Sequence, residues 1–103
     1  MATGKEYLEF VLGQCGGLSA RPMMGEYVLY YGGKVVGGIY DDRLLVKPTP
    51  SALAMLPSSP METPYEGAKK MLLLEDIENR ELLEELFEKM QNELPEPKKR
   101  NKK

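Results

Sequence analysis

Residues 27–47 read YVLYYGGKVVGGIYDDRLLVK, in which strand-forming residues are interrupted by two pairs of turn residues. This stretch opens with aromatic and branched residues, which favour a β-strand, and continues into Gly32-Gly33, a two-residue turn that tolerates positive φ at both positions. A second tight turn is predicted at Asp41-Asp42, because aspartate is a common turn residue. We therefore predict an antiparallel meander of three strands, over residues 27–31, 34–40 and 43–47.

Two-residue turns sort the side chains of this meander onto two faces, because they place Tyr31 opposite Lys34 and Tyr40 opposite Arg43. One face is almost purely apolar, and we expect the helices to pack on Val28, Tyr30, Val35, Gly37, Ile39, Leu44 and Val46. The other face has an apolar centre and a basic, phenolic rim, made of Tyr27, Leu29, Tyr31, Lys34, Val36, Gly38, Tyr40, Arg43, Leu45 and Lys47. We interpret this second face as half of an interface, filled by self-association or by another ligand, unless a helix of the chain crosses back and covers it.

A helix is predicted before the meander. Thr3 and Glu6 have the spacing of a capping box, in which the two side chains satisfy each other's free backbone N–H groups. Apolar residues between positions 7 and 12 form a broad stripe, and Gly16-Gly17 supplies the left-handed stop that follows a last turn. The helix is therefore expected to end at residue 14 or 15.

The second half of the chain predicts two helices and one strand. Thr49 can cap a short helix that starts at Pro50 and ends before Pro57. Residues 57–69 indicate an irregular surface loop, which Tyr65 would pin to the body. The apolar run at 71–74 suits a strand buried on both faces. Asp76 can then cap a last helix, which has apolar residues at helical spacing: Leu82, Leu83, Leu86, Phe87, Met90 and Leu94.

The expected order is helix, three strands, short helix, fourth strand and C-terminal helix. This is an α+β fold with a mainly antiparallel sheet and helices packed mainly on one sheet face, and the place of the fourth strand is left open. A length of 103 residues suits one domain. We place that domain at residues 1–96 and a basic, disordered tail at 97–103.

Composition excludes several classes of protein. No apolar run approaches the roughly 20 residues of a membrane helix, and the N-terminus has no basic segment followed by an apolar one, so we expect a cytoplasmic protein without a membrane partner. The chain has one cysteine and no histidine, which excludes an internal disulfide, imidazole catalysis and the usual Cys/His zinc site. We expect no enzyme, no metal and no cofactor.

The charges are concentrated at the C-terminus, in Lys98, Lys99, Arg100, Lys102 and Lys103. With five of the 14 basic residues there, the other nine stand against 16 acidic residues, which gives residues 1–97 a net charge of −7. A body of that sign should repel phosphate backbones. The tail is therefore interpreted as a solvated segment, with a nucleic-acid-binding arm as the alternative.

Four smaller features have a structural and a functional interpretation. Asp41-Asp42 could bind a hard cation, but a turn already explains both carboxylates. Cys15 is expected to be a buried small hydrophobe rather than a reactive thiol. Gly37-Gly38 is expected to let another segment approach the middle strand closely, because no phosphate-binding motif accompanies it. Arg21 and Glu26 are expected to form an ion pair, with contact between Arg21 and a partner as the alternative.

Beyond these patterns, the chain resembles a known family. The run from Arg21 to Tyr31, then Gly33-Lys34, Asp41 to Leu44 and Lys47-Pro48, resembles the N-terminal domain of the TfoX/Sxy family of bacterial competence regulators. The flanks agree, in Lys5-Glu6-Tyr7-Leu8-Glu9-Phe10-Val11, Pro64-Tyr65-Glu66-Gly67-Ala68-Lys69 and Asn79-Arg80-Glu81-Leu82-Leu83. Met24 departs from the pattern, since an aromatic residue is common there, but a thioether can fill the same pocket. The resemblance covers the chain from Lys5 to Pro95.

The resemblance implies a regulatory rather than a catalytic role. Longer members of the family resemble transcriptional coactivators of competence genes and carry a second, helical domain, which we expect this chain to lack. No catalytic residue is carried over by the resemblance. It is similar instead to stand-alone domains whose biochemical role is undefined.

Two functions are therefore expected as alternatives. The first is a non-enzymatic regulatory and protein-interaction module, expected to be a homodimer, which presents Tyr27, Tyr31, Tyr40, Arg43 and Lys47, or the loop with Arg21, Met23 and Met24. The second is a small nucleic-acid-binding protein, in which the basic tail supplies affinity and the tyrosines stack on bases. The acidic body counts against the second.

Overall fold

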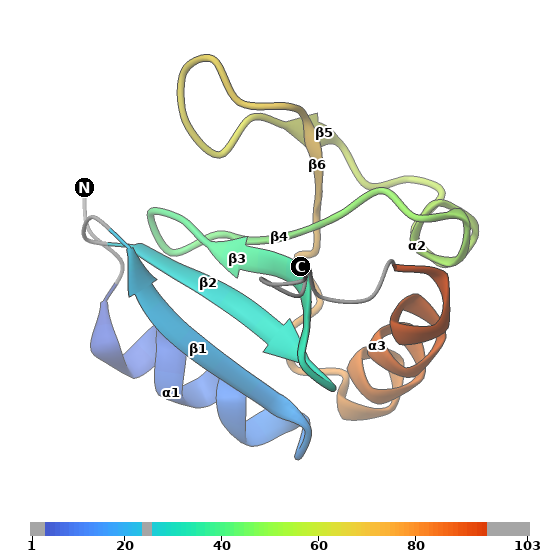
Figure 1. Cartoon of the computed structure of the whole chain (residues 1–103), viewed down its shortest axis with the longest axis horizontal. Coiled ribbons are helices and arrows are strands. Elements are labelled where there is room, and N and C mark those ends of the chain that lie inside the picture. Colours follow the sequence, from blue (N-terminus) through green and yellow to red (C-terminus); the bar gives the residue numbers. More distant parts are fainter. Residues whose placement is uncertain (1–3, 24–25, 95–103) are drawn as a thin grey trace, which may run out of the picture.

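The computed structural model describes residues 4–23 and 26–94 and has an α+β architecture, as predicted. A six-stranded antiparallel sheet has the order β1-β2-β3-β4-β6-β5. Helices α1 and α3 lie on one side of it, and α2 lies beside α3 (Figure 1). The elements are α1 (Lys5–Gln14), β1 (Leu18–Met23), β2 (Glu26–Tyr31), β3 (Lys34–Ile39), β4 (Leu44–Val46), α2 (Pro50–Met55), β5 (Met61–Glu62), β6 (Met71–Leu73) and α3 (Arg80–Glu93).

Both tight turns of the meander are confirmed. Gly32 and Gly33 have φ of 62° and 84°, and Asp41 and Asp42 have φ of 55° and 58°, so all four residues adopt the left-handed conformation that two-residue hairpins need. Tyr31 pairs with Lys34 as predicted. At the second turn, the backbones of Tyr40 and Arg43 exchange two hydrogen bonds of 2.9 and 3.0 Å.

A β-bulge in the middle of the first hairpin overturns the predicted sorting of faces. The register shifts between Leu29 and Tyr30, so that Leu29 pairs with Gly37 instead of Val36. One extra residue on β3 exchanges the two faces along the rest of the hairpin. The face that packs on the helices therefore combines Tyr27, Leu29, Tyr31 and Val36 with Ile39, Leu44 and Val46.

The opposite face of the sheet, which we call the open face, holds residues that the sequence assigned to the core. Val28, Tyr30 and Val35 are only half-buried there and do not belong to the hydrophobic core. The predicted interface centred on Tyr27, Leu29 and Tyr31 is thus wrong, because helices of the same chain cover these residues. The alternative of coverage by the chain itself is correct for this part of the sheet.

The sequence pattern does not predict two of the strands, β1 and β5. β1, which pairs with β2 at the sheet edge, lies in the segment predicted to be a connection, and its Pro22 obscures the strand pattern. β5 lies within the predicted irregular loop and pairs with β6 over two residues. The fourth predicted strand, β6, lies between β4 and β5, and it is buried on one face only, since Leu72 is buried while Met71 and Leu73 are half-buried.

The core lies between the sheet and the helices. The buried side of α3 consists of Leu83, Leu86, Phe87 and Met90, at the helical spacing that the sequence predicts. From α1, Leu8 and Val11 enter the same core. Gly37 lets β4 approach closely, because a Cβ there would lie 2.1 Å from the backbone oxygen of Leu45. The predicted role of this glycine is confirmed.

The predicted helix caps are confirmed at α2 and wrong at α3. Thr49 caps α2 by accepting a hydrogen bond from the backbone N–H of Ala52 at 3.2 Å. Thr3, the predicted N-cap of α1, lies outside the described residues, and the N-cap position is taken by Gly4, whose N–H donates to the carboxylate of Asp42 at 2.8 Å. The N-cap of α3 is Asn79 rather than Asp76.

Over the described residues, no helix combines the length and the apolar character that a membrane span requires.

Candidate functional site

The most exposed aromatic side chain among the described residues, Tyr65, lies over the open face of the sheet. Its ring packs edge-on against Tyr40, with 6.2 Å between ring centroids and 60° between ring planes. Tyr40 is 7% exposed, whereas Tyr65 is 57% exposed. Tyr65 therefore forms one wall of a surface feature whose floor is Tyr40.

Two hollows meet at this tyrosine pair, and both are lined by Tyr40, Pro64 and Tyr65. One has a volume of about 480 Å³ and is completed by Met23 and Glu26. The other has a volume of about 370 Å³ and is completed by Lys47, Pro48, Ala68, Lys69, Lys70 and Met71. We call the two hollows together the Tyr65 groove. The first hollow is apolar apart from Glu26, and the second has a basic rim.

The segment between β5 and β6 that carries Tyr65 is held in place by backbone contacts. A tight turn runs from Tyr65 to Ala68, whose N–H donates to the Tyr65 carbonyl oxygen at 3.1 Å. Gly67 has φ of 88° in this turn, which suits the third position of a type II turn. At the base, the N–H of Leu73 donates to the carbonyl oxygen of Pro60 at 3.0 Å. The loop is thus the end of a hairpin.

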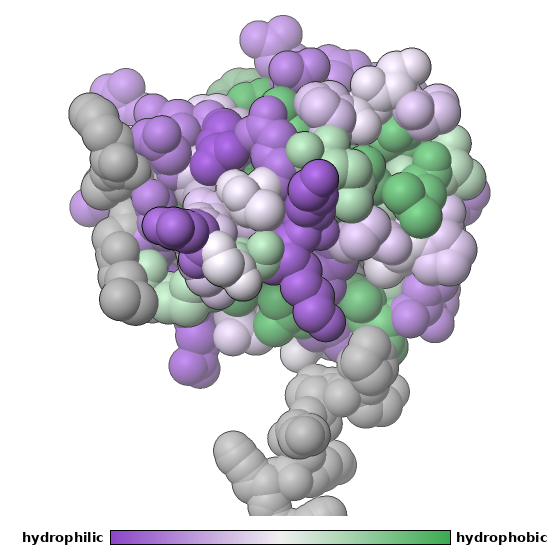
Figure 2. All heavy atoms as spheres, turned by 90° about the horizontal axis from the view of Figure 1, so that it is seen from above, coloured by the Kyte–Doolittle hydropathy of each residue, from purple (hydrophilic) through white to green (hydrophobic). Residues whose placement is uncertain are grey.

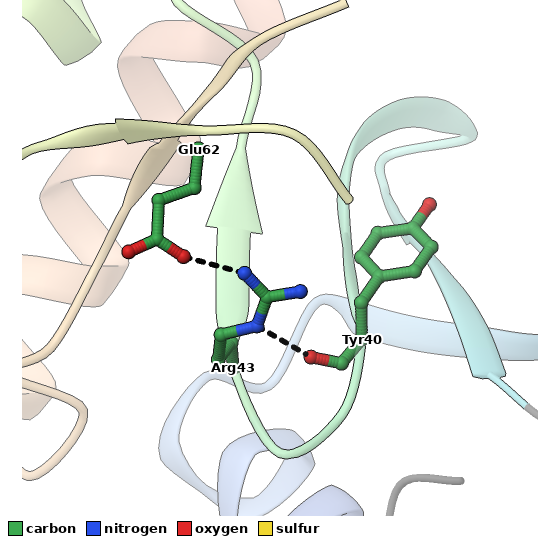
Figure 3. Close-up of polar contacts among 3 residues, drawn as sticks. All are labelled: Tyr40, Arg43 and Glu62. Atoms are coloured by element: carbon green, nitrogen blue, oxygen red, sulfur yellow. Dashed lines mark hydrogen bonds and ion pairs between the residues drawn. The ribbon is translucent and has the colours of Figure 1, made fainter. Parts of the chain in front are cut away.

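A polar clamp joins this hairpin to the strand turn beneath it (Figure 3). Arg43 Nε donates to the backbone oxygen of Tyr40 at 3.2 Å, and Arg43 Nη1 forms an ion pair with Glu62 Oε1 at 2.5 Å. The arginine therefore links β5 to the residue that forms the floor of the groove. Arg43 was predicted as a partner-binding residue, and the structure gives it these contacts within the chain.

The phenol of Tyr40 has a structural rather than a reactive role in the groove. Burial, followed by the neighbouring Tyr65 and Glu26, raises the pKa of Tyr40, so the phenol stays neutral over the physiological range. Glu26 accepts a hydrogen bond from the backbone N–H of Asp41 at 3.0 Å, which supports the turn next to Tyr40. The ion pair with Arg21 that the sequence predicts for Glu26 is not formed within residues 4–23 and 26–94.

Seen from the side on which the hairpin loop projects in Figure 1, apolar patches alternate with hydrophilic side chains (Figure 2). Lys69 and Lys70 are exposed and line the same hollow as Tyr65, so charged and apolar side chains are neighbours at this site. A surface of this kind combines an apolar contact area with charges that orient a partner.

The predicted interaction residues are only partly brought together. Met23, Tyr40 and Lys47 line the Tyr65 groove. Arg21 is exposed on the same edge strand as Met23. Met24 and the tail residues Lys98, Lys99, Arg100, Lys102 and Lys103 lie outside the described residues. Pro64, Tyr65, Lys69 and Lys70 were not proposed as site residues, although an aromatic residue in a proline-containing loop is a signal that could have indicated them.

Two predicted tyrosines belong to the helix-covered side. Tyr31 stacks on Phe87 of α3, with 5.9 Å between centroids, and its hydroxyl donates to Glu88 at 3.2 Å. Tyr27 also packs against the core. The single surface of Tyr27, Tyr31 and Tyr40 that the sequence predicts is therefore wrong, because the bulge places Tyr40 on the other side of the sheet.

A third hollow lies beside Tyr31 and has an acidic lining. Its volume is about 450 Å³, and it is lined by Cys15, Gly16, Gly17, Tyr31, Glu81, Glu84, Glu85 and Glu88. Cys15 is buried, and its burial raises the pKa of the thiol, as expected for a structural cysteine. Within residues 4–23 and 26–94, no three or more potential metal-ligating side chains are grouped to hold an ion. Asp42, at the second tight turn, holds the start of α1 instead.

Comparison with known proteins identifies the family. The family model of the TfoX N-terminal domain matches residues 11–92. The chain belongs to the TfoX N-terminal domain family. An uncharacterised 12.7 kDa protein in the trpE 5' region of Spirochaeta aurantia is 36% identical over 107 residues, which cover all of this chain and 93% of that protein. No solved structure matches the chain. In this TfoX N-terminal domain, every residue that lines the Tyr65 groove falls within the matched range.

Proposed function

We propose that this TfoX N-terminal domain is a non-enzymatic regulatory module that binds a protein partner through the Tyr65 groove. The observation that carries the proposal is the exposed ring of Tyr65 above the buried ring of Tyr40, on a sheet face that the described helices leave open. Tyrosine, methionine and proline side chains dominate the apolar part of the groove, and aromatic residues and methionine are enriched at protein interfaces. The resemblance of the sequence motifs to competence regulators, together with membership of the TfoX N-terminal domain family, supports the regulatory part.

We extend the proposal to a homodimer that uses the rest of the open face. Val28, Tyr30 and Val35 are half-buried there, outside the hydrophobic core. A second copy placed over these side chains would remove their apolar surface from water, which is the main favourable term in association. Light scattering should then give twice the mass of one chain, and Val35→Glu should return the mass to that of a monomer. A monomer at all concentrations would contradict the dimer and leave the groove proposal standing.

The groove itself is tested by photo-crosslinking in cells. Tyr65 is replaced by p-benzoylphenylalanine, and Leu53 of α2 is replaced in the control, because its side chain is exposed to a similar extent, at 50% against 57%. We expect an adduct of discrete mass at position 65 and none at position 53. Adducts at neither position, or the same adducts at both, would contradict a protein-binding role for the groove.

Nucleic-acid binding is a second candidate, and one observation favours it. The exposed ring of Tyr65 lies in a groove whose rim includes Lys69 and Lys70. Proteins that bind single-stranded nucleic acids use such a combination, with the ring stacking on a base and the cations contacting phosphates. A labelled oligothymidine should then bind at low salt, and binding should fall at high salt and after deletion of residues 98–103. Absence of binding by the intact chain at low salt would exclude this function.

A further inference from the structure

The Tyr65 groove has an uneven charge distribution. The rim of the second hollow carries Lys47, Lys69 and Lys70, and no carboxylate lines that hollow. Within the described part of the chain, no hydrogen bond or ion pair of this structure joins any of the three ammonium groups to another residue. This basic rim stands out on a body whose net charge over residues 1–97 is −7.

The first hollow differs from the second in chemistry. Its lining is apolar, from Met23, Tyr40, Pro64 and Tyr65, and its one carboxylate, on Glu26, already accepts the backbone N–H of Asp41. The hollows share the tyrosine pair, so an extended ligand that occupies both would contact an apolar pocket first and a basic rim next. A segment that combines an apolar side chain with neighbouring acidic side chains matches this order.

We propose that the Tyr65 groove binds an acidic peptide segment of a partner protein, with an apolar side chain among Met23, Tyr40 and Tyr65 and carboxylates on Lys47, Lys69 and Lys70. This inference rests on the proposed function and adds the chemistry of the partner. The apolar contact with Tyr65 supplies affinity, because burial of an aromatic ring removes a large area from water. The lysines supply orientation and the preference for an acidic segment.

A peptide is favoured over a nucleic acid because the basic charge is local. Three lysines line one hollow, whereas Glu26 lines the adjoining one and Glu66 lies next to Tyr65 in the same exposed loop. A phosphate backbone that follows the groove would meet these carboxylates, and its affinity depends on many successive cation contacts. A short peptide places its few carboxylates on one side of its apolar residue and avoids that repulsion.

The test is selection of short random peptides displayed on phage against the full chain. We expect the recovered peptides to have a net negative charge and an aromatic or aliphatic residue beside the acidic ones. Tyr65→Ala should weaken their binding about tenfold, as measured by fluorescence anisotropy with synthetic peptides. The double variant K69E/K70E should reverse the selection and recover basic peptides. The matched control K5E/K89E changes the same number of charges at exposed lysines of α1 and α3 and should leave the acidic preference unchanged.

Four outcomes would overturn the inference, and they separate it from the proposed function. Peptides that depend on Tyr65 but have no acidic preference would end the inference and leave the protein-interaction module standing. Recovery of no peptide that depends on Tyr65 would count against both. Displacement of the peptides by an oligothymidine would assign the groove to nucleic acid. A doubled mass that K69E/K70E abolishes would assign it to a second copy of the chain.

Discussion

The ammonium group of Lys34 lies 2.7 Å from the backbone carbonyl oxygen of Gln91 and 3.1 Å from that of Leu94, so the first hairpin turn caps the end of α3. The last carbonyl groups of a helix have no partner within the helix, and the helix dipole favours a cation there. The Tyr31-Gly32-Gly33-Lys34 turn, which the sequence predicts from local chemistry, therefore also stabilises a helix nearly 60 residues later.

Replacement of Lys34 should destabilise the fold. Lys34→Met keeps most of the apolar stem but removes the charged donor, and a hydrogen bond to a charged group contributes about 1.5–3 kcal/mol. We expect the free energy of unfolding in urea to fall by about that amount. Lys34→Arg keeps a cation and donors and should lose less. Equal losses for the two variants would show that the charge contributes nothing.

The contact between α2 and α3 predicts a pH dependence. The carboxylate of Glu93 accepts hydrogen bonds from the Ser51 hydroxyl and, at 3.0 Å, from the Ser51 backbone N–H. These bonds, the hydroxyl one first, lower the pKa of Glu93 from its ordinary value of 4.5. Because the folded pKa is the lower one, this stabilisation is present above pH 4.5 and is lost as the pH falls through the folded pKa.

Glu93→Gln should remove that pH-dependent component. Thermal unfolding followed from neutral pH to below pH 4 should show a shallower acid loss of stability in the variant than in the parent. Glu85→Gln is the control, because its carboxylate pairs with Lys89 of the same helix on the exposed surface of α3. Identical acid profiles for the parent and Glu93→Gln would contradict the assignment.

The close approach at the β-bulge predicts a severe effect of one methyl group. A Cβ at Gly37 would lie 2.1 Å from the Leu45 oxygen and 2.8 Å from the Val46 Cα, both of which are backbone atoms that cannot rotate away. Gly37→Ala should therefore cost about 3 kcal/mol, the upper end of the range for overpacking. Gly13→Ala should instead stabilise by about 0.5–1 kcal/mol, because Gly13 is in α1 with open space around it. Chemical denaturation of both variants measures the difference.

The Arg43 clamp predicts a change in local motion rather than in global stability. The side chains of Arg43 and Glu62 are 32% and 34% exposed, and such ion pairs contribute only about 0–1 kcal/mol. Glu62→Gln should leave the unfolding midpoint nearly unchanged but speed amide hydrogen exchange in residues 61–73. Unchanged exchange in the β5–β6 hairpin would show that its backbone contacts alone position Tyr65.

Much of the fold is predictable because it depends on local chemistry. The turns at Gly32-Gly33 and Asp41-Asp42, the Thr49 cap and the apolar spacing of α3 are each decided within a few neighbouring residues. β1 is not predicted because it contains Pro22 and few apolar residues, and because it is stabilised by its pairing with β2. The acidic N-cap partner of α1 is not predicted because Asp42 is distant in the chain.

The candidate site was predictable only in fragments. The sequence indicates Met23, Tyr40 and Lys47, which line the groove. It places Tyr40 on one surface with Tyr27 and Tyr31, however, and not beside Tyr65. The one-residue shift at the bulge changes which side chains of β2 and β3 lie on the same face of the sheet. Neither the predicted register nor the observed one violates a local preference. Tyr65 joined the site because its hairpin folds back over Tyr40, which depends on the pairing of β5 with β6.

The meander, the turn conformations, α2 with its cap and the amphipathic α3 arise from short-range forces, so these elements, together with the family, follow from the amino-acid sequence alone. Tertiary structure decided which face of the sheet the helices cover and which side chains meet above the other face. Local preference does not fix strand register or loop placement, because the pairing of Leu29 with Gly37 and the packing of Tyr65 on Tyr40 depend on the assembled core.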